Sequence, residues 1–252
     1  MDKVRVIARI DVKNEFAIKG IHLEGLRKVG NPNEMARKYY RHGIDEIIFM
    51  DAVAAYYDRN SLSHIIKSAC NDVFIPITVG GGIRTLDDIK VALASGADKV
   101  AINTQAVRNP EFITEASEMF GSQCIVASID AKMISNNYWE AYTDNGREPS
   151  GKDAVEWAKH LERLGAGEIM VTSIDSEGTK RGFDTDLMDS IVRCTEIPII
   201  VCGGAGNVGH VEEVLKLSNA DAVANASIFH YDLVDVLELK NELRSKGIEV
   251  RI

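Results

Sequence analysis

The sequence predicts a single (β/α)8 barrel of the α/β class, on three observations. Eight short apolar runs recur along the 252 residues, and segments with the 3.6-residue period of an amphipathic helix lie between them. No low-complexity tract or linker rich in serine and glycine marks a boundary between two domains. The second half of the chain also repeats the pattern of the first. Eight strands alternating with helices are the number that closes such a barrel.

The repeat divides the chain into two expected halves, roughly residues 1–120 and 121–252. "ARIDVK" at 8–13 resembles "ASIDAK" at 127–132, and three further pairs of strand segments match at offsets between 119 and 123 residues. A repeat of this length describes a half barrel and excludes a solenoid of short repeats. We therefore expect one domain, residues 1–252, built from two homologous (β/α)4 halves.

The first strand, "VRVIARIDVK", alternates between an apolar face and a face that carries Arg5, Arg9 and Asp11. On an open sheet the second face would meet solvent, as in an ordinary amphipathic edge strand. In a closed barrel it points into the lumen instead.

The amino-acid composition excludes some classes of binding partner. A formal net charge of -9 and a pI near 5.2 argue against nucleic acid and membrane surfaces, which need a basic footprint, but leave room for a basic pocket that binds a phosphorylated small molecule. With no signal peptide or membrane span, we expect a cytoplasmic protein. The four cysteines form no C-x-x-C pair and the six histidines lack ligand spacing, so we expect reduced thiols, no metal and no cofactor.

Two aspartates are the candidate catalytic residues. Asp11 and Asp130 occupy equivalent positions near the C-terminal ends of the first and fifth barrel strands, where the sites of such barrels lie. Opposed carboxylates suit a general acid and a general base, because different environments can separate their pKa values. The alternative is a pair of strand-end aspartates that cap loops.

Two glycine runs are candidate phosphate sites. "VGGGIR" and "VCGGAG" each follow a strand and are expected to open a helix, so that backbone N–H groups converge on an anion. The next strands end in Asn103 and Thr104 in one half and in Ala226 and Ser227 in the other. One glycine-rich turn would be weak evidence, but two at symmetric positions suggest a long ligand with a phosphate at each end.

A ring of charges is expected at the opposite rim, where the strands begin. Its members are Arg5, Glu46, Lys99 and Glu168, with alternating sign. The pattern by itself favours a structural ring that closes the bottom of the barrel, and the alternative is a gate to a path through it.

The motifs that carry a family resemblance are "DVKN", "VGGGIR", "GADKVAINT", "FGSQCIVASIDAK", "GGAGN" and "ASIFH". Through them the sequence resembles HisF, the cyclase subunit of imidazole glycerol phosphate synthase, over essentially the whole chain. The resemblance implies a lyase that receives ammonia from a HisH-type glutaminase docked on the N-terminal face of the barrel. The ammonia reacts with a bisphosphate ribulosyl aminoimidazole nucleotide, giving imidazole glycerol phosphate and an aminoimidazole carboxamide ribotide.

The resemblance also implies roles for single residues. Asp11 and Asp130 match the catalytic pair, Lys19 matches a substrate-binding lysine on a mobile loop, and the four rim charges match an ammonia gate. The matched phosphate-site residues are Gly82, Asn103 and Thr104 in the first half and Gly178, Gly204, Ala226 and Ser227 in the second, with Glu177 in place of an aspartate before Gly178.

Two residues depart from the family pattern and change the side chains expected to line the lumen. Arg9 stands where the family commonly has a small cysteine, and Ser128 holds the paired position on the fifth strand. By the two-residue period both point the same way as the aspartates, and an arginine there would lower the pKa of Asp11 and narrow the channel. These changes resemble a HisF-related, WbuZ-like branch of surface-polysaccharide gene sets, in which ammonia amidates a nucleotide-linked sugar. That acceptor, a non-catalytic scaffold and a related isomerase of histidine biosynthesis remain alternatives.

Overall fold

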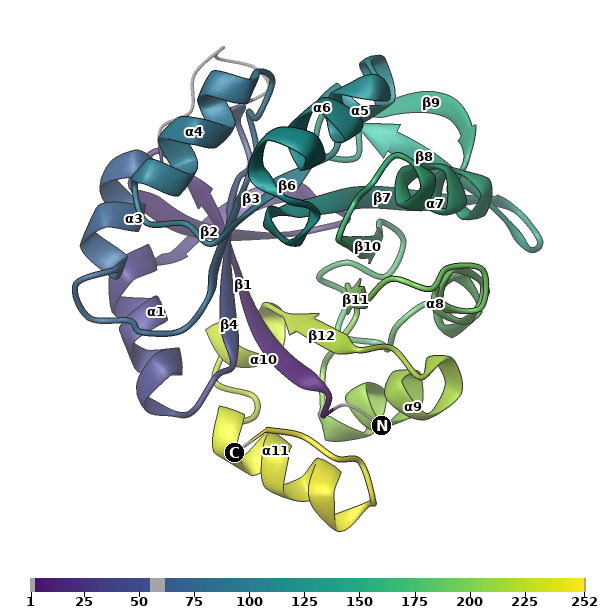
Figure 1. Ribbon diagram of the computed structural model, residues 1–252. Helices are drawn as coiled ribbons and strands as arrows, with labels where there is room; N and C mark the ends of the chain where they lie inside the picture. The colour runs from purple at the N-terminus through teal and green to yellow at the C-terminus, as the bar shows by residue number, and fades with distance from the viewer. Residues whose placement is uncertain (1–2, 55–61, 252) are drawn as a thin grey trace.

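The computed structural model describes residues 3–54 and 62–251, and its centre is a closed barrel of eight parallel strands (Figure 1). Each strand pairs with the next, and β12 closes the circle by pairing with β1. The prediction of a (β/α)8 barrel is therefore confirmed. In their order around the barrel the strands are β1 (Arg5–Lys13), β4 (Glu46–Asp51), β5 (Ile77–Gly80), β6 (Lys99–Ile102), β7 (Ile125–Ser135), β10 (Glu168–Ser173), β11 (Ile199–Cys202) and β12 (Ala222–Asn225).

Helices surround the strands on the outside (Figure 1). Most begin at a side chain that accepts hydrogen bonds from the first backbone N–H groups, such as Asn31 before α1 and Thr85 before α4. The described helices are α1 (Pro32–Arg41), α3 (Ser63–Ala69), α4 (Leu86–Ala94), α5 (Thr104–Arg108), α6 (Glu111–Phe120), the 3₁₀ turn η1 (Ser122–Cys124), α7 (Ala154–Arg163), α8 (Thr185–Val192), α9 (Val208–Ser218), α10 (Ser227–His230) and α11 (Val236–Ser245).

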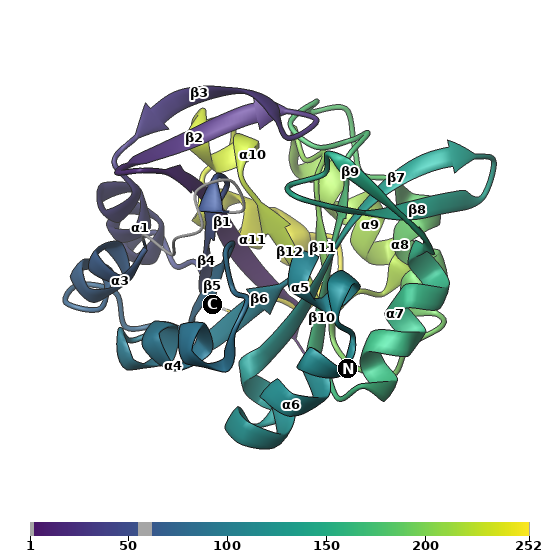
Figure 2. The same cartoon turned by 90° about the horizontal axis from the view of Figure 1, so that it is seen from above.

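Two antiparallel hairpins, which the sequence analysis did not foresee, extend the barrel strands at one end. Strand β1 continues into β2 (Phe16–Ile21) and β3 (Glu24–Gly30), and β7 continues into β8 (Tyr138–Thr143) and β9 (Glu148–Asp153). Figure 2 shows both hairpins on the same face of the molecule. Their equivalent positions on the first and fifth barrel strands support the proposal of two homologous halves.

The alternation of β1 sorts its side chains between two apolar regions. Val6, Ala8 and Ile10 belong to the large core between the strands and the helices. Ile7 instead belongs to a smaller cluster inside the barrel, together with Val126 and further inward-facing residues of other strands. The polar face of β1 therefore points into the lumen, as the closed barrel required.

None of the helices in the described ranges is long and apolar enough to cross a membrane.

Candidate functional site

Asp11 and Asp130 lie at equivalent places, where the barrel strands continue into the hairpins. Asp11 pairs in register with Ile18 of β2, and Asp130 pairs with Tyr142 of β8. The strand order puts β1 and β7 four positions apart, on opposite sides of the barrel. Both carboxyl groups are buried. The fold thus places the two candidate catalytic groups across the mouth from one another.

Two cations surround the carboxylate of Asp11. Arg9 Nε donates a hydrogen bond to Asp11 Oδ1 at 2.8 Å, and Lys19 Nζ lies 3.8 Å from Asp11 Oδ2. Burial by itself raises the pKa of Asp11, but the charges of Arg9 and Lys19 outweigh it and hold that pKa below its usual range. Asp11 is therefore a carboxylate at neutral pH.

Asp130 has a different environment. Its Oδ2 accepts a hydrogen bond of 3.0 Å from Nδ2 of the neutral side chain of Asn103. Burial raises the pKa of Asp130, and the charge of Arg9 together with the hydrogen bond from Asn103 offsets this only in part. The charge of Asp11 adds to the upward shift, so the net shift is upward. Asp130 keeps its proton to a higher pH than Asp11 does, which suits a proton donor.

Arg9 lies across the lumen and is 2% exposed. Its Nη1 donates to Thr172 Oγ1 on β10 at 3.0 Å and lies 3.6 Å from Cys202 Sγ on β11, although neither strand is a neighbour of β1. Ala224 on β12, which pairs in register with Cys202, is a small side chain that faces the same interior. The structure thus places Arg9 between the apolar interior and Asp11.

Lys19 lies on strand β2 and is buried, whereas the resemblance implied a mobile loop. The difference has a physical cause, because Lys19 forms an ion pair with Glu177 and also lies near Asp11. These contacts hold the lysine over the site, and a buried ammonium needs such partners. Burial lowers the pKa of Lys19, although Asp11 opposes that shift.

The first candidate phosphate site is a cavity of about 130 Å³. Gly82, Asn103 and Thr104 line it together, as the sequence analysis expected. Gly81 and Gly82 adopt positive φ in the turn after β5, which glycine permits. The glycine run does not open α4 directly, because that helix begins at Leu86. The short helix α5 begins beside the cavity instead.

The second candidate site is smaller, with a cavity of about 10 Å³. All five residues expected there line it: Glu177, Gly178, Gly204, Ala226 and Ser227. A Cβ at Gly204 would come within 2.0 Å of the Gly182 carbonyl oxygen, so the turn requires glycine. The second glycine run precedes α9 by several residues, and α10 begins at the site instead. The Oγ of Ser227 is buried with no hydrogen-bond partner among the described residues.

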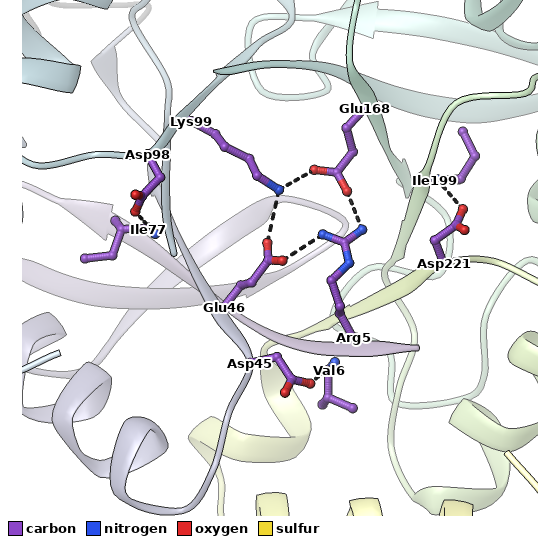
Figure 3. A network of polar contacts seen from close by, with 10 residues as sticks. All are labelled: Arg5, Val6, Asp45, Glu46, Ile77, Asp98, Lys99, Glu168, Ile199 and Asp221. Atoms are coloured by element: carbon purple, nitrogen blue, oxygen red, sulfur yellow. Dashed lines mark hydrogen bonds and ion pairs between the residues drawn. The ribbon is translucent and has the colours of Figure 1, made fainter. Parts of the chain in front are cut away.

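The four rim charges form a closed ring at the other end of the barrel (Figure 3). Arg5 pairs with Glu46 and Glu168, and Lys99 pairs with the same two glutamates. Burial lowers the pKa of Arg5, but the two glutamates outweigh it and raise that pKa above its ordinary value.

Outside this ring, three aspartates accept a hydrogen bond from the backbone N–H of a neighbouring strand. They are Asp45, Asp98 and Asp221. These bonds fix the strand ends from which the ring side chains project.

Several residues of the site were missed by the sequence analysis. Thr172 and Cys202 hold Arg9, and their inward position on β10 and β11 could have been read from the two-residue period. Arg108 and Asp144 line the first cavity, and no motif marks them. His230 lies near Lys19 and Asp11, and burial lowers its pKa to about 4. The neutral imidazole therefore adds no charge beside Asp11 at neutral pH.

Within residues 3–54 and 62–251, no group of three histidine, cysteine, aspartate or glutamate side chains is arranged to hold a metal ion. The first cavity is lined by the glycine turn after β5, by uncharged donors such as Asn103 and Thr104, and by the cationic side chains of Arg84 and Arg108, and the second is lined by glycine turns and Ser227. Such donors are suited to anions.

Comparison with known proteins gives a consistent result. Residues 5–235 match the family described as histidine biosynthesis protein. The chain is 56% identical over 208 residues to an imidazole glycerol phosphate synthase subunit HisF from Legionella pneumophila, covering 82% of this chain and 98% of that protein. It is 47% identical over 248 residues to the HisF subunit from Thermococcus onnurineus strain NA1, covering 98% of each chain.

Proposed function

The chain belongs to the histidine biosynthesis protein family and to its HisF subunits, and on that premise we propose how its site performs the cyclase reaction. The enzyme is the cyclase, or lyase, subunit of an imidazole glycerol phosphate synthase. Its acceptor is the bisphosphate ribulosyl aminoimidazole nucleotide, which ammonia converts to imidazole glycerol phosphate and an aminoimidazole carboxamide ribotide. The observation that carries the mechanism is the pair of equivalent aspartates in opposite electrostatic environments.

We infer that Asp130 acts as the general acid and Asp11 as the general base. Ammonia adds to the ribulosyl carbonyl carbon, and Asp130 donates a proton to the oxygen that becomes negative. Asp11, held as a carboxylate by Arg9, accepts a proton from the nitrogen that becomes positive. The upward shift of the pKa of Asp130 and the downward shift of the pKa of Asp11 both favour these roles.

The two cavities fit the two ends of the acceptor. Gly82, Asn103 and Thr104 would bind one phosphate. Gly178, Gly204, Ala226 and Ser227 would bind the other, and the buried Ser227 hydroxyl, which has no partner within the described residues, would donate a hydrogen bond to it. Lys19 would exchange its pairing with Glu177 for the substrate. Because the cavities follow strands of opposite halves, a bound bisphosphate would span the mouth between the aspartates.

The partner is proposed to be a HisH-type glutaminase on the face where the barrel strands begin. The charged ring lies on that face, and several segments that lead into strands expose large apolar side chains there. Phe74 is 75% exposed, Met119 61% and Leu217 52%. Exposed apolar groups around a charged entrance are features of a protein docking surface. The ring then acts as the ammonia gate, and a cytoplasmic location stays a prediction.

The direct test is turnover of the ribulosyl nucleotide by the purified chain with ammonium chloride in place of glutamine. Wild-type protein is expected to form both products, and a matched preparation without ammonium is expected to form neither. Failure of a folded preparation to form product at any ammonium concentration would contradict the proposal.

A second candidate changes only the acceptor, to a nucleotide-linked sugar of surface-polysaccharide synthesis. Two observations favour it: Arg9 fills part of the lumen, and the second cavity is narrow. Complementation of a histidine-requiring strain that lacks its own cyclase separates the two. Growth supports the histidine acceptor, whereas failure despite abundant folded protein supports the sugar.

A further inference from the structure

The lumen between the charged ring and the aspartates is unequally filled. On the side of β10–β12, the guanidinium of Arg9 occupies the interior and is fixed by Asp11, Thr172 and Cys202. Three partners on three strands hold this side chain in one place. A small molecule that rises from the ring on this side therefore meets a fixed cation.

On the opposite side the first cavity reaches down into the lumen. Its lining includes Met50 on β4, Ala101 on β6 and Ser128 on β7, all of which face inward. Ala101 and Ser128 lie below Asn103 and Asp130 by one step of the two-residue strand period, about 7 Å. The floor of the cavity therefore lies beneath Asn103 and Asp130, on the side of the charged ring.

Strand β6 connects this floor to the charged ring. Lys99, a member of the ring, is two residues before Ala101 and shares its face of the strand. The lysine side chain is 20% exposed, the largest exposed fraction in the ring. The ring is therefore most open at the strand that leads to the small side chain of Ala101.

From this arrangement we propose that ammonia crosses the upper lumen off its axis, along β6 and β7, past Ala101 and Ser128, and emerges beside Asp130. The proposal rests on the proposed function, because it assigns the route within a barrel that uses ammonia. It makes Ala101 and Ser128 path-lining residues, while the guanidinium of Arg9 stays fixed on the side of β10 and β11.

The chemistry along this route suits neutral ammonia. A fixed guanidinium repels ammonium, and in a buried lumen that repulsion is weakly screened. The Ser128 hydroxyl can both donate and accept, so it can replace the hydrogen bonds that ammonia loses on leaving water. The exit beside Asp130 delivers the nucleophile to the carboxyl group that protonates the acceptor.

The test uses the complex with the glutaminase and compares glutamine with ammonium chloride as the nitrogen source. Ala101→Val adds two methyl groups on the proposed route. It is expected to lower the ratio of glutamine-driven to ammonium-driven turnover about tenfold, because ammonium from the open mouth reaches the acceptor without passing this side chain, while any effect on acceptor binding cancels in the ratio. Glutamine consumed per product formed should rise by the same factor of about ten.

Ala222→Val is the matched control, because it adds the same bulk inside the barrel on the β12 side. It is expected to leave the coupling of glutamine to product unchanged, and melting temperatures report whether either variant is misfolded. Ser128→Val provides a second block if Ala101→Val unfolds. Normal coupling in both route variants, or uncoupling by Ala222→Val alone, overturns the route. Wild-type complex that makes no product from either nitrogen source overturns the proposed function itself.

Discussion

The two sides of the barrel mouth are built on the same repeat, yet their electrostatics are opposite. Asp130 accepts a hydrogen bond from the neutral amide of Asn103 and lines the cavity of about 130 Å³, whereas Asp11 pairs with Arg9 and lies 3.8 Å from Lys19. Equivalent backbone positions therefore carry carboxyl groups with pKa values displaced in opposite directions. The comparison teaches that the carboxylate on β1 is neutralised by cations of the chain itself, whereas the carboxyl group on β7 faces a cavity that is open to a ligand.

The strongest test of this comparison is to remove each carboxylate in turn. Asp11→Asn and Asp130→Asn each abolish one proton transfer and are expected to lower ammonium-driven turnover by about 10³-fold, within the range for general acid or base catalysis. Steady-state assays with saturating acceptor measure the effect. Activity within tenfold of wild type in either variant would remove that residue from the mechanism.

The same two variants, Asp11→Asn and Asp130→Asn, should also differ in their free energy of unfolding. Asp11→Asn leaves the buried guanidinium of Arg9 without its carboxylate and is expected to cost about 3–5 kcal/mol of unfolding free energy. Asp130→Asn removes no ion pair and is expected to cost less than about 1 kcal/mol at neutral pH. Denaturant unfolding measures both. Equal losses would show that the two sites are electrostatically alike.

The unfolding free energies of Asp11→Asn and Asp130→Asn, each relative to wild type, should change with pH in opposite directions. The folded pKa of Asp11 is lowered, so its contribution to stability is present above the unfolded value of about 3.9 and is lost as pH falls through the folded pKa. The folded pKa of Asp130 is raised, so its ionisation destabilises the fold as pH rises through that pKa. Asp130→Asn should therefore gain stability relative to wild type with rising pH, and Asp11→Asn should approach wild type at low pH.

Replacing Arg9 tests the cause of the asymmetry. Arg9→Met keeps much of the side-chain length without the charge, so burial should raise the pKa of Asp11 and move the acidic limb of the kcat profile upward. Arg9→Lys retains a cation and is expected to restore much of the wild-type profile. An unshifted acidic limb in a folded Arg9→Met variant would show that Arg9 does not set the ionisation of Asp11.

The smallest expected effect concerns the second cavity. Ser227→Ala removes a hydroxyl that has no partner among the described residues, so melting temperature should not change. Loss of one hydrogen bond to a phosphate is expected to raise KM about three- to tenfold with little change in kcat. A KM equal to that of wild type would place the phosphate elsewhere.

The sequence predicted what depends on local period and on the repeat. The alternation in β1 predicted that Arg5, Arg9 and Asp11 point into the lumen, and the strand ends predicted residues that line two cavities, which stay candidate phosphate sites. The residues that Arg9 contacts across the barrel were not predictable in detail, because Thr172 meets it only through closure of the barrel. The hairpins were missed, so the burial of Lys19 was missed as well.

The central claim is that Asp11 is ionised and Asp130 protonated over a shared range of pH. Site-resolved 13C NMR titration of the two carboxyl carbons in the wild-type protein measures this most directly. The account predicts that Asp11 titrates below its ordinary value and Asp130 above it. Coincident titration of the two groups, or Asp130 ionising at lower pH than Asp11, would contradict the assignment of acid and base.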